Sequence, residues 1–507
     1  MKKFKILYII GVAAFAFGIS GCSKDFLDQM PTDVISEEDL DKGVAQDPEL
    51  LEASIRGLYG TMFELGTGGT DLDHDDFGQK GYDIYMDLMS SDMALMGVNY
   101  GWYRDVSRYT ATVDYTNNAT YKPWRYYYRI VFSANSVIDA LGGTDTTPED
   151  VDSRHHMGQA KAMRAYAYFY LANLYAPEGY GTGSEKILPI YTNAEDTENA
   201  PLSTSEEVYK LIIADLNEAI ELLDDYNRGS TKTQINKNVA QGLLAYALAA
   251  RGSNEDLEEA AEITQNLIDN SGHPLTSKNQ VVAQLDDNDN LLNSEAGFNS
   301  VKTESWMWGA DITLSNDLDL VSWWGQVDMF TYSYAAVGDP KGIDENLLSE
   351  IPDSDLRKDQ FASDYTPINK FFTPERVVMG QRSIETDYIY MRIDEFYLLN
   401  AEVNARLGND AAAKTSLKKL LTERFEDVSD ISYVDNLNGE ALKDEIYLQT
   451  RIELWGEGKI YLAMKRNKKS STRGGNHVFH VGKTFQYNDK ELSLVIPQQE
   501  VLNNPNL

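Results

Sequence analysis

Residues 158–177 read GQAKAMRAYAYFYLANLYAP, and their helical pattern decides the fold class. Alanine and bulky aromatic side chains alternate around a helix through this stretch. Apolar side chains recur at three- and four-residue intervals, which places them on one helix face: Ala160, Met163, Ala167, Tyr170 and Leu174. Proline cannot continue a helix, so Pro177 ends the pattern. The stretch predicts a helix over residues 158–176.

A second helix follows in the next part of the chain. Ser203 and Glu206 stand three residues apart, as the two partners of a capping box do. One apolar face continues behind them: Val208, Leu211, Ile212, Ala219, Ile220 and Leu223. We therefore expect a helix that begins at this box.

Two later stretches, residues 246–262 and 397–417, have the pattern of a helix, a glycine-centred turn and a second helix. Gly252 and Gly408 supply the left-handed residue that ends the first helix of each pair. Such hairpins resemble tetratricopeptide repeats, although the spacing is irregular. The alternative is a set of unrelated helical hairpins. The chain predicts an all-α, irregular tetratricopeptide-like scaffold.

Between these hairpins, residues 272–389 lose the helical pattern. A polar run, residues 286–290, precedes a series of aromatic residues: Trp306, Trp308, Trp323, Trp324, Phe330, Tyr332 and Tyr334. We expect long ordered loops with short strands, inserted into the helical scaffold. Ordered loops of this length usually carry function.

The N-terminus has the pattern of a secretory signal peptide over residues 1–21. Three lysines precede an apolar stretch, residues 6–19, which is too short to cross a bilayer. Residues 19–22 read ISGC and resemble the lipobox of bacterial lipoproteins, in which the cysteine sulfur is acylated. The prediction is a lipid anchor at Cys22 and a tether over residues 22–48. The alternative is that Cys22, the only cysteine, is a free thiol.

The rest of the chain, residues 49–507, is long enough for a single large domain. The formal charge is −35, and it becomes −38 for residues 22–507 because residues 1–21 contain three lysines and no acid. So acidic a surface repels nucleic-acid phosphates and anionic lipid headgroups. We expect no nucleic-acid partner, and membrane contact only through the anchor.

Four motifs, in this order, resemble the signatures of the SusD/RagB family of nutrient-binding lipoproteins. They are KAMRAYAYFYL at 161–171, MRIDEFYLLNAE at 391–402, RIEL at 451–454 with Glu457-Gly458, and LVIP at 494–497 with Glu500 and residues 504–507. The third motif departs from its relatives, because Lys459-Ile460-Tyr461 stands where an arginine–tryptophan pair is usual. Cys22, followed by DFLD at 25–28 and by Pro31, also fits the start of the family, so the resemblance covers essentially the whole chain after the predicted signal peptide.

This resemblance implies a lipoprotein on the outer face of a Gram-negative outer membrane. It also implies a non-catalytic protein that captures oligosaccharide or polysaccharide and delivers it to a SusC-like TonB-dependent transporter. The Arg and Glu residues of the signature motifs are scaffold in the family, so we do not place them in the ligand site.

Sugar binding requires flat apolar faces beside polar groups that satisfy the hydroxyls. Two stretches offer both, and the resemblance implies a site built from loops in these two regions. The candidate ligand-binding residues are Asn99, Trp102, Tyr103, Arg104, Trp306, Trp308, Trp323 and Trp324. Core packing is the alternative for each tryptophan. Trp323 and Trp324 are expected to point to opposite sides of an extended segment.

Metal-binding patterns are poor, and we expect no cofactor. His477 and His480 are three residues apart but lack flanking ligands. Asp71, Asp73, Asp75 and Asp76 are spaced in a calcium-like way, yet the glycine and glutamate of an EF-hand are misplaced. Some relatives bind structural calcium, so a calcium ion stays an alternative to a solvated acidic loop.

Two further functions stay open. A member of the same family could import peptides, whose capture would depend on salt because of the charge. An all-α glycoside hydrolase would also be acidic and lined with aromatic residues, and it would need two carboxylates at a set separation. No motif singles out such a pair among the 80 acidic residues.

Overall fold

The structure, a computed structural model, describes residues 48–70, 73–196, 199–288, 290–293, 296–373, 376–377, 379–380 and 383–507. The predicted signal peptide, Cys22 and residues 22–47 of the tether lie outside the described residues, and so does Asp71. Contacts divide the chain after Leu51, and the fold below is that of residues 52–507. Within the described ranges, none of the helices has the length and apolar composition that a membrane span requires.

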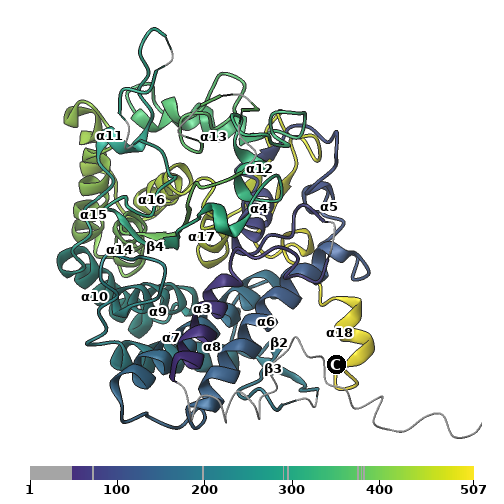
Figure 1. Ribbon diagram of the computed structural model, residues 1–507. Coiled ribbons are helices and arrows are strands. Elements are labelled where there is room, and N and C mark those ends of the chain that lie inside the picture. Colours follow the sequence, from purple (N-terminus) through teal and green to yellow (C-terminus); the bar gives the residue numbers. More distant parts are fainter. Residues whose placement is uncertain are drawn as a thin grey trace, which may run out of the picture. The chain divides into compact units, whose positions relative to one another are not determined.

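The scaffold consists of helices that pack on their neighbours in sequence (Figure 1). The longer helices are α3 (Pro48–Gly60), α4 (Gln79–Ser90), α6 (Asn118–Ala140), α7 (Val151–Tyr175), α8 (Ser205–Leu222), α9 (Lys237–Arg251), α10 (Asn254–Asn270), α14 (Asp394–Arg406), α15 (Asp410–Thr422), α16 (Glu440–Glu453) and α17 (Ile460–Arg466). Helices α6 to α10 each contact the next, α10 contacts α14, and α14 contacts α15 and α16. The all-α prediction is confirmed.

Helix α7 carries the stretch that decided the fold class. Asp150 caps it by accepting a hydrogen bond from the Ser153 N–H at 2.9 Å. Every residue from Met157 to Tyr175 is buried, because α6 and α8 pack along the helix. Alanines between the rings allow these neighbours to approach closely, which explains why alanine and aromatic residues alternate here.

The predicted turns of the two hairpins are confirmed. Gly252 ends α9 at a φ of 77°, and Gly408 follows α14 at a φ of 80°. The predicted start of α8 was wrong by one residue, because Ser203 lies in strand β3 and pairs there with Leu188. The capping box is formed instead by Thr204 and Glu207.

Strands are short and occur in two-stranded antiparallel pairs within the described residues. The pairs are β1 (Met93–Leu95) with β5 (Lys341–Ile343), β2 (Lys186–Pro189) with β3 (Leu202–Thr204), β4 (Trp306–Ala310) with β6 (Tyr388–Arg392), and β7 (Ser471–Thr472) with β8 (Thr484–Phe485). Two pairs join the loop-rich segment to other parts of the chain: β1 with β5, and, at its end, β4 with β6.

The segment 272–389 contains only short elements, as predicted. They include α11 (Lys278–Val281), η2 (Leu314–Asn316), α12 (Trp323–Val327), α13 (Glu345–Glu350) and η3 (Leu356–Gln360). Figure 1 shows α11, α12 and α13 on one side of the scaffold, away from α7 and α8. The remaining short elements are α5 (Arg104–Ser107), η4 (Val428–Asn436), η5 (Lys490–Leu492) and α18 (Gln498–Asn503).

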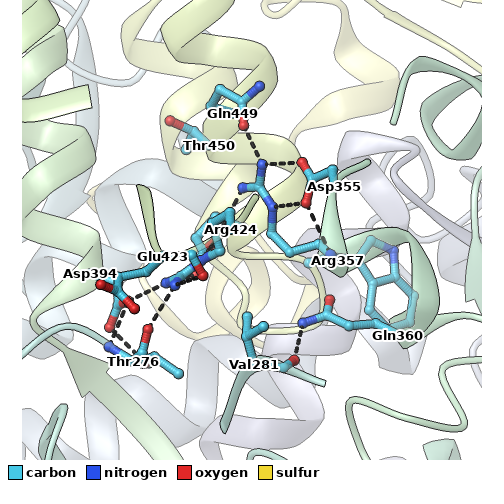
Figure 2. A network of polar contacts seen from close by, with 12 residues as sticks. Thr276, Val281, Asp355, Arg357, Gln360, Asp394, Glu423, Arg424, Gln449 and Thr450 are labelled. Atoms are coloured by element: carbon cyan, nitrogen blue, oxygen red, sulfur yellow. Dashed lines mark hydrogen bonds and ion pairs between the residues drawn. The ribbon is translucent and has the colours of Figure 1, made fainter. Parts of the chain in front are cut away.

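A buried charge network joins the loop-rich segment to the scaffold, and Figure 2 shows part of it. It contains four basic and four acidic residues, each at most 3% exposed: Arg357, Lys370, Arg392, Arg424, Asp355, Asp394, Glu453 and Glu457. Glu453 accepts from Arg392 at 2.7 Å, from Arg424 at 2.8 Å and from Arg357 at 3.0 Å. The charges balance, so each buried ion has partners of opposite sign.

The network shows what the signature motifs do. Arg392 and Asp394 come from the second motif, and Glu453 and Glu457 come from the third. Burial alone would raise the pKa of Glu453, but the guanidinium groups of Arg424 and Arg392 hold it well below its usual range. The prediction that these motif residues belong to the scaffold is confirmed.

Candidate functional site

Aromatic side chains from three separate segments meet in one cluster, which we call the aromatic platform: His74, Tyr100, Trp102 and Tyr334. The His74 and Trp102 rings stack at 5.0 Å with an interplanar angle of 7°. Tyr334 meets Tyr100 at 5.1 Å and Trp102 at 6.0 Å, in both cases edge to face. His74 Nδ1 and the Tyr334 hydroxyl also form a hydrogen bond. The two regions singled out in the sequence therefore meet here.

Hydrogen bonds to the backbone hold the segment around Tyr100 against the loop-rich segment. The Asp339 carboxylate accepts from the Tyr100 N–H at 3.1 Å and from the Gly101 N–H at 3.0 Å. Asn99 Nδ2 donates to the Val337 carbonyl at 3.2 Å. Gly101 has a φ of 84°, a value that glycine adopts without strain. The turn thus presents Tyr100 and Trp102 next to Tyr334.

A buried lysine lies beneath the platform. Lys341 Nζ donates to the Gln326 side-chain oxygen at 3.0 Å and to the Asp339 carbonyl at 3.2 Å. Gln326 Nε2 donates in turn to the His74 carbonyl at 2.8 Å. Burial lowers the pKa of Lys341 to about 7, although Asp339 and Asp75 oppose the shift. Lys341 therefore connects the supports of two platform segments.

The platform offers ring surface to solvent. Tyr100 is 61% exposed, and Trp102 and His74 are half-buried, whereas Tyr334 is buried. Asn99 and Arg104 are exposed beside it. Flat rings with an amide and a guanidinium at the rim match the two needs of sugar recognition, stacking and hydrogen bonding to hydroxyls.

The structure corrects the second group of candidate residues. Trp306, Trp308, Trp323 and Trp324 are each at most 1% exposed, so none presents a face to a ligand. Trp308 packs edge to face against Tyr166, and Trp324 Nε1 donates to the Thr386 carbonyl at 2.7 Å. These are core side chains.

Two further expectations change. Trp323 and Trp324 do not divide between two sides of an extended segment, because both lie in helix α12 and both are buried. Tyr103 is also in the core at 2% exposed, and Lys341 Nζ lies 5.2 Å from the centre of its ring. Of the eight candidates, Asn99, Trp102 and Arg104 are at the surface of the platform.

Sequence reasoning missed three residues of the site: His74, Asp339 and Lys341. Tyr334 appeared in the aromatic series of the loop-rich segment but was not singled out. Only its aromatic side chain suggested a role in binding, and the larger rings of the nearby tryptophans made them better candidates. His74 stands among acidic residues, and nothing local marks it as the partner of Trp102.

Within the described residues, no group of three or more His, Cys, Asp or Glu side chains could hold a metal ion. Asp73 and Asp75 both pair with Lys122, at 2.8 Å and 2.5 Å. His477 pairs with Asp344 at 3.1 Å. The acidic and histidine candidates in the described residues therefore have protein partners.

Two family models match the chain. A SusD-like model described as "Starch-binding associating with outer membrane" matches residues 77–251, and the model of the SusD family matches residues 283–507. The first match ends with helix α9, inside the first helical hairpin, and the second begins inside the loop-rich segment. Both the scaffold helices α6 to α9 and the charge network lie in matched residues.

Individual relatives agree with the family models. A SusD-like protein of Bacteroides ovatus is 25% identical over 299 residues, which are 57% of this chain and 49% of that protein. The match thus spans about half the length of that relative. A crystal structure of a SusD-like carbohydrate-binding protein from Bacteroides vulgatus is 24% identical and has a TM-score of 0.70, covering 90% of this chain and 96% of that chain.

A further solved structure, described as containing a xylogluco-oligosaccharide, is 17% identical. It has a TM-score of 0.60 and covers 90% of this chain and 97% of that chain. These structures share the fold of this chain over nine-tenths of its length. With both of its halves matched by SusD models, the chain belongs to the SusD family.

Proposed function

We propose that this protein is a cell-surface lipoprotein that binds glycans and passes them to a TonB-dependent transporter. The aromatic platform is the observation that carries this proposal. Trp102 and Tyr100 offer partly exposed rings, and Asn99 and Arg104 stand beside them. A pyranose ring has an apolar face and polar edges, so it fits such a surface.

The support of the platform favours binding of a ligand without large rearrangement. Asp339 and Gln326 fix the backbone on both sides, and Lys341 joins these two supports from below. A surface fixed before the ligand arrives loses less conformational entropy on binding. We expect micromolar to millimolar dissociation constants, equivalent to roughly −8 to −4 kcal/mol.

The remaining parts of the proposal extend the family resemblance to this chain. Cys22 would carry the lipid anchor, and a SusC-like barrel would receive the glycan. The proposed role is capture without catalysis. The carboxylate nearest the platform backbone, Asp339, accepts two backbone N–H groups and thus serves the fold.

The test is a binding screen with the full chain, purified in detergent, against plant, host and microbial polysaccharides and against peptides. Affinity electrophoresis reports retention, and a reducing-sugar assay reports cleavage. Retention by at least one polysaccharide, with no new reducing ends, is the expected result. Peptide binding without glycan binding would favour peptide import, and new reducing ends would favour a hydrolase.

A further inference from the structure

A groove with aromatic side chains in its wall lies between helices α6 and α18, apart from the aromatic platform. Two adjoining cavities of about 220 Å³ and 370 Å³ share Trp124, Tyr128, Phe132 and Glu500. We call them together the α6–α18 groove. The larger of the two volumes lies within the range of small-molecule sites, about 300–1,000 Å³. None of the candidate residues from the sequence lines it.

The helical spacing of α6 builds the aromatic wall. Trp124, Tyr128 and Phe132 stand four residues apart, so their side chains lie along one helix face. Phe132 is 58% exposed, which is unusual for a ring of this size. Trp124 is mostly buried and forms the floor, and Tyr128 is half-buried between them. The groove therefore has an apolar floor and one widely exposed ring.

The opposite wall is fixed in place. The Gln498 N–H donates to the Tyr115 carbonyl at 2.8 Å, which holds the start of α18. Asn199 Nδ2 donates to the Asn503 carbonyl at 2.7 Å, which holds its end. Tyr128 itself is fixed, because its hydroxyl donates to the Pro189 carbonyl at 2.8 Å. The groove is thus formed before any ligand binds.

Polar side chains on this wall have free hydrogen-bonding capacity. The side-chain amides of Gln499 and Asn503 line the groove and have no hydrogen-bond partner within the described part of the chain. Each amide offers both donors and an acceptor, as a sugar hydroxyl requires. Ring surface on one wall and free amides on the other repeat the chemistry of the aromatic platform.

The charge of the groove distinguishes among ligand classes. Two basic residues, Arg125 and Arg129, and two acidic residues, Asp196 and Glu500, line the groove, so the formal charges of its lining cancel. Arg129 itself pairs with Glu64, outside the lining, at 3.1 Å. The chain as a whole carries a formal charge of −35. A locally neutral groove on so acidic a protein suits an uncharged ligand better than a basic or acidic peptide.

From these observations we infer that the α6–α18 groove is a second binding site for a neutral oligosaccharide. The inference rests on the proposed function, because it assigns to the same protein a second contact with its glycan. Two weak sites on one chain increase the retention of a long polysaccharide that reaches both, because the second contact becomes intramolecular.

The test compares three variants of the full chain, purified in detergent, by calorimetry. The probe is the tightest-binding member of a panel of xylogluco-, cello-, malto- and manno-oligosaccharides. The groove variant is Phe132→Ala with Gln499→Ala, and the platform variant is Trp102→Ala. The control is Leu314→Ala, which removes a side chain that is 59% exposed, against 58% for Phe132.

The expected result is two sites per wild-type chain and one site in either the groove or the platform variant. Loss of the Phe132 ring alone should weaken binding at the groove about two- to tenfold. The control variant should bind as wild type does. Circular dichroism of the groove variant should match wild type, because both changed side chains are exposed.

Three results would overturn the inference. A single site in wild type that the groove variant keeps would reject the groove but leave the proposed function intact. A groove variant that binds glycan normally but no longer co-purifies with a membrane protein would assign the groove to a protein partner. A full chain that binds no member of the panel would overturn both the groove site and the proposed function. A fourth result, loss of binding in the groove variant but not in the platform variant, would support the groove and reject the platform.

Discussion

The buried charge network and the aromatic platform lie in the same chain but are built differently. The network uses charged residues that are almost completely buried, and each carboxylate has several partners. The platform combines partly exposed rings with the buried Tyr334, and its three segments are held mainly by hydrogen bonds to backbone groups. Half of the network residues, Arg392, Asp394, Glu453 and Glu457, come from the signature motifs, whereas the platform residues lie outside every motif. The signature residues therefore stabilise the scaffold, and we propose that the loops around the platform determine which ligand is bound.

The largest expected effect comes from breaking the network at its centre. Glu453→Ala leaves Arg357, Arg392 and Arg424 buried without their shared carboxylate. Removing one partner of a buried ion pair typically costs about 3–5 kcal/mol. Denaturant unfolding should show this loss. The control is Glu440→Ala at the exposed start of the same helix, which should change the free energy of unfolding little. Equal effects of the two changes would contradict the role of the network.

The substitution Trp323→Ala tests whether this tryptophan belongs to the core or to the ligand site. Its ring is 1% exposed and lies 4.2 Å from Lys80 Nζ, so Trp323→Ala should destabilise the fold by about 3–5 kcal/mol. Glycan affinity of the molecules that remain folded should be unchanged. Thermal unfolding and calorimetry below the transition measure the two effects separately. Weaker glycan binding with unchanged stability would show that Trp323 is a ligand-binding residue and not a core residue.

The carboxylate behind the platform should affect both properties moderately. Asp339→Ala leaves the Tyr100 and Gly101 N–H groups without their acceptor, which costs about 1–3 kcal/mol and loosens the turn. Glycan affinity should fall with it. Asp339→Asn keeps one acceptor oxygen and should recover part of both losses. A turn held by other contacts would leave affinity unchanged in both variants.

The last expected effect is a pH dependence at Lys341. The network guanidinium groups donate to carboxylates, whereas Lys341 donates to amide and carbonyl oxygens, and burial lowers its pKa to about 7 from 10.5. Between these pH values the unfolded chain holds a proton that the folded chain has released, so stability rises with pH.

Lys341→Met should remove this contribution. The variant should therefore be most stable relative to wild type below pH 7. The difference in free energy of unfolding, variant minus wild type, should fall as pH rises from 7 toward 10.5. Denaturant unfolding at several pH values measures the difference. A difference that does not change with pH would show that Lys341 keeps its ordinary pKa in the folded chain.

The sequence predicted the parts of the fold that local patterns control. The helix around residues 158–176, the glycine turns at Gly252 and Gly408, and the loop-rich segment follow from periodicity and turn chemistry. One capping box was misplaced by a residue, because Thr204 and Glu207 repeat the spacing of Ser203 and Glu206. Only the pairing of Ser203 in β3 distinguishes the two boxes.

The sequence predicted the two regions of the candidate site but only some of its residues. Asn99 and Trp102 were identified because aromatic and amide side chains are adjacent in sequence there. Whether a tryptophan in residues 306–324 faces solvent depends on packing partners such as Tyr166 and Phe371, which lie elsewhere in the chain. Tyr334 meets Trp102 only through tertiary contacts, and no local spacing encodes them.

The measurement that tests the account most directly is the glycan affinity of Trp102→Ala relative to Leu314→Ala, both in the full chain. Trp102 stacks on His74 at the exposed edge of the platform, whereas Leu314 is an exposed side chain outside it. We predict that Trp102→Ala weakens binding about tenfold or more while the unfolding temperature stays close to that of wild type. Wild-type affinity in Trp102→Ala would contradict the assignment of the aromatic platform as the glycan site.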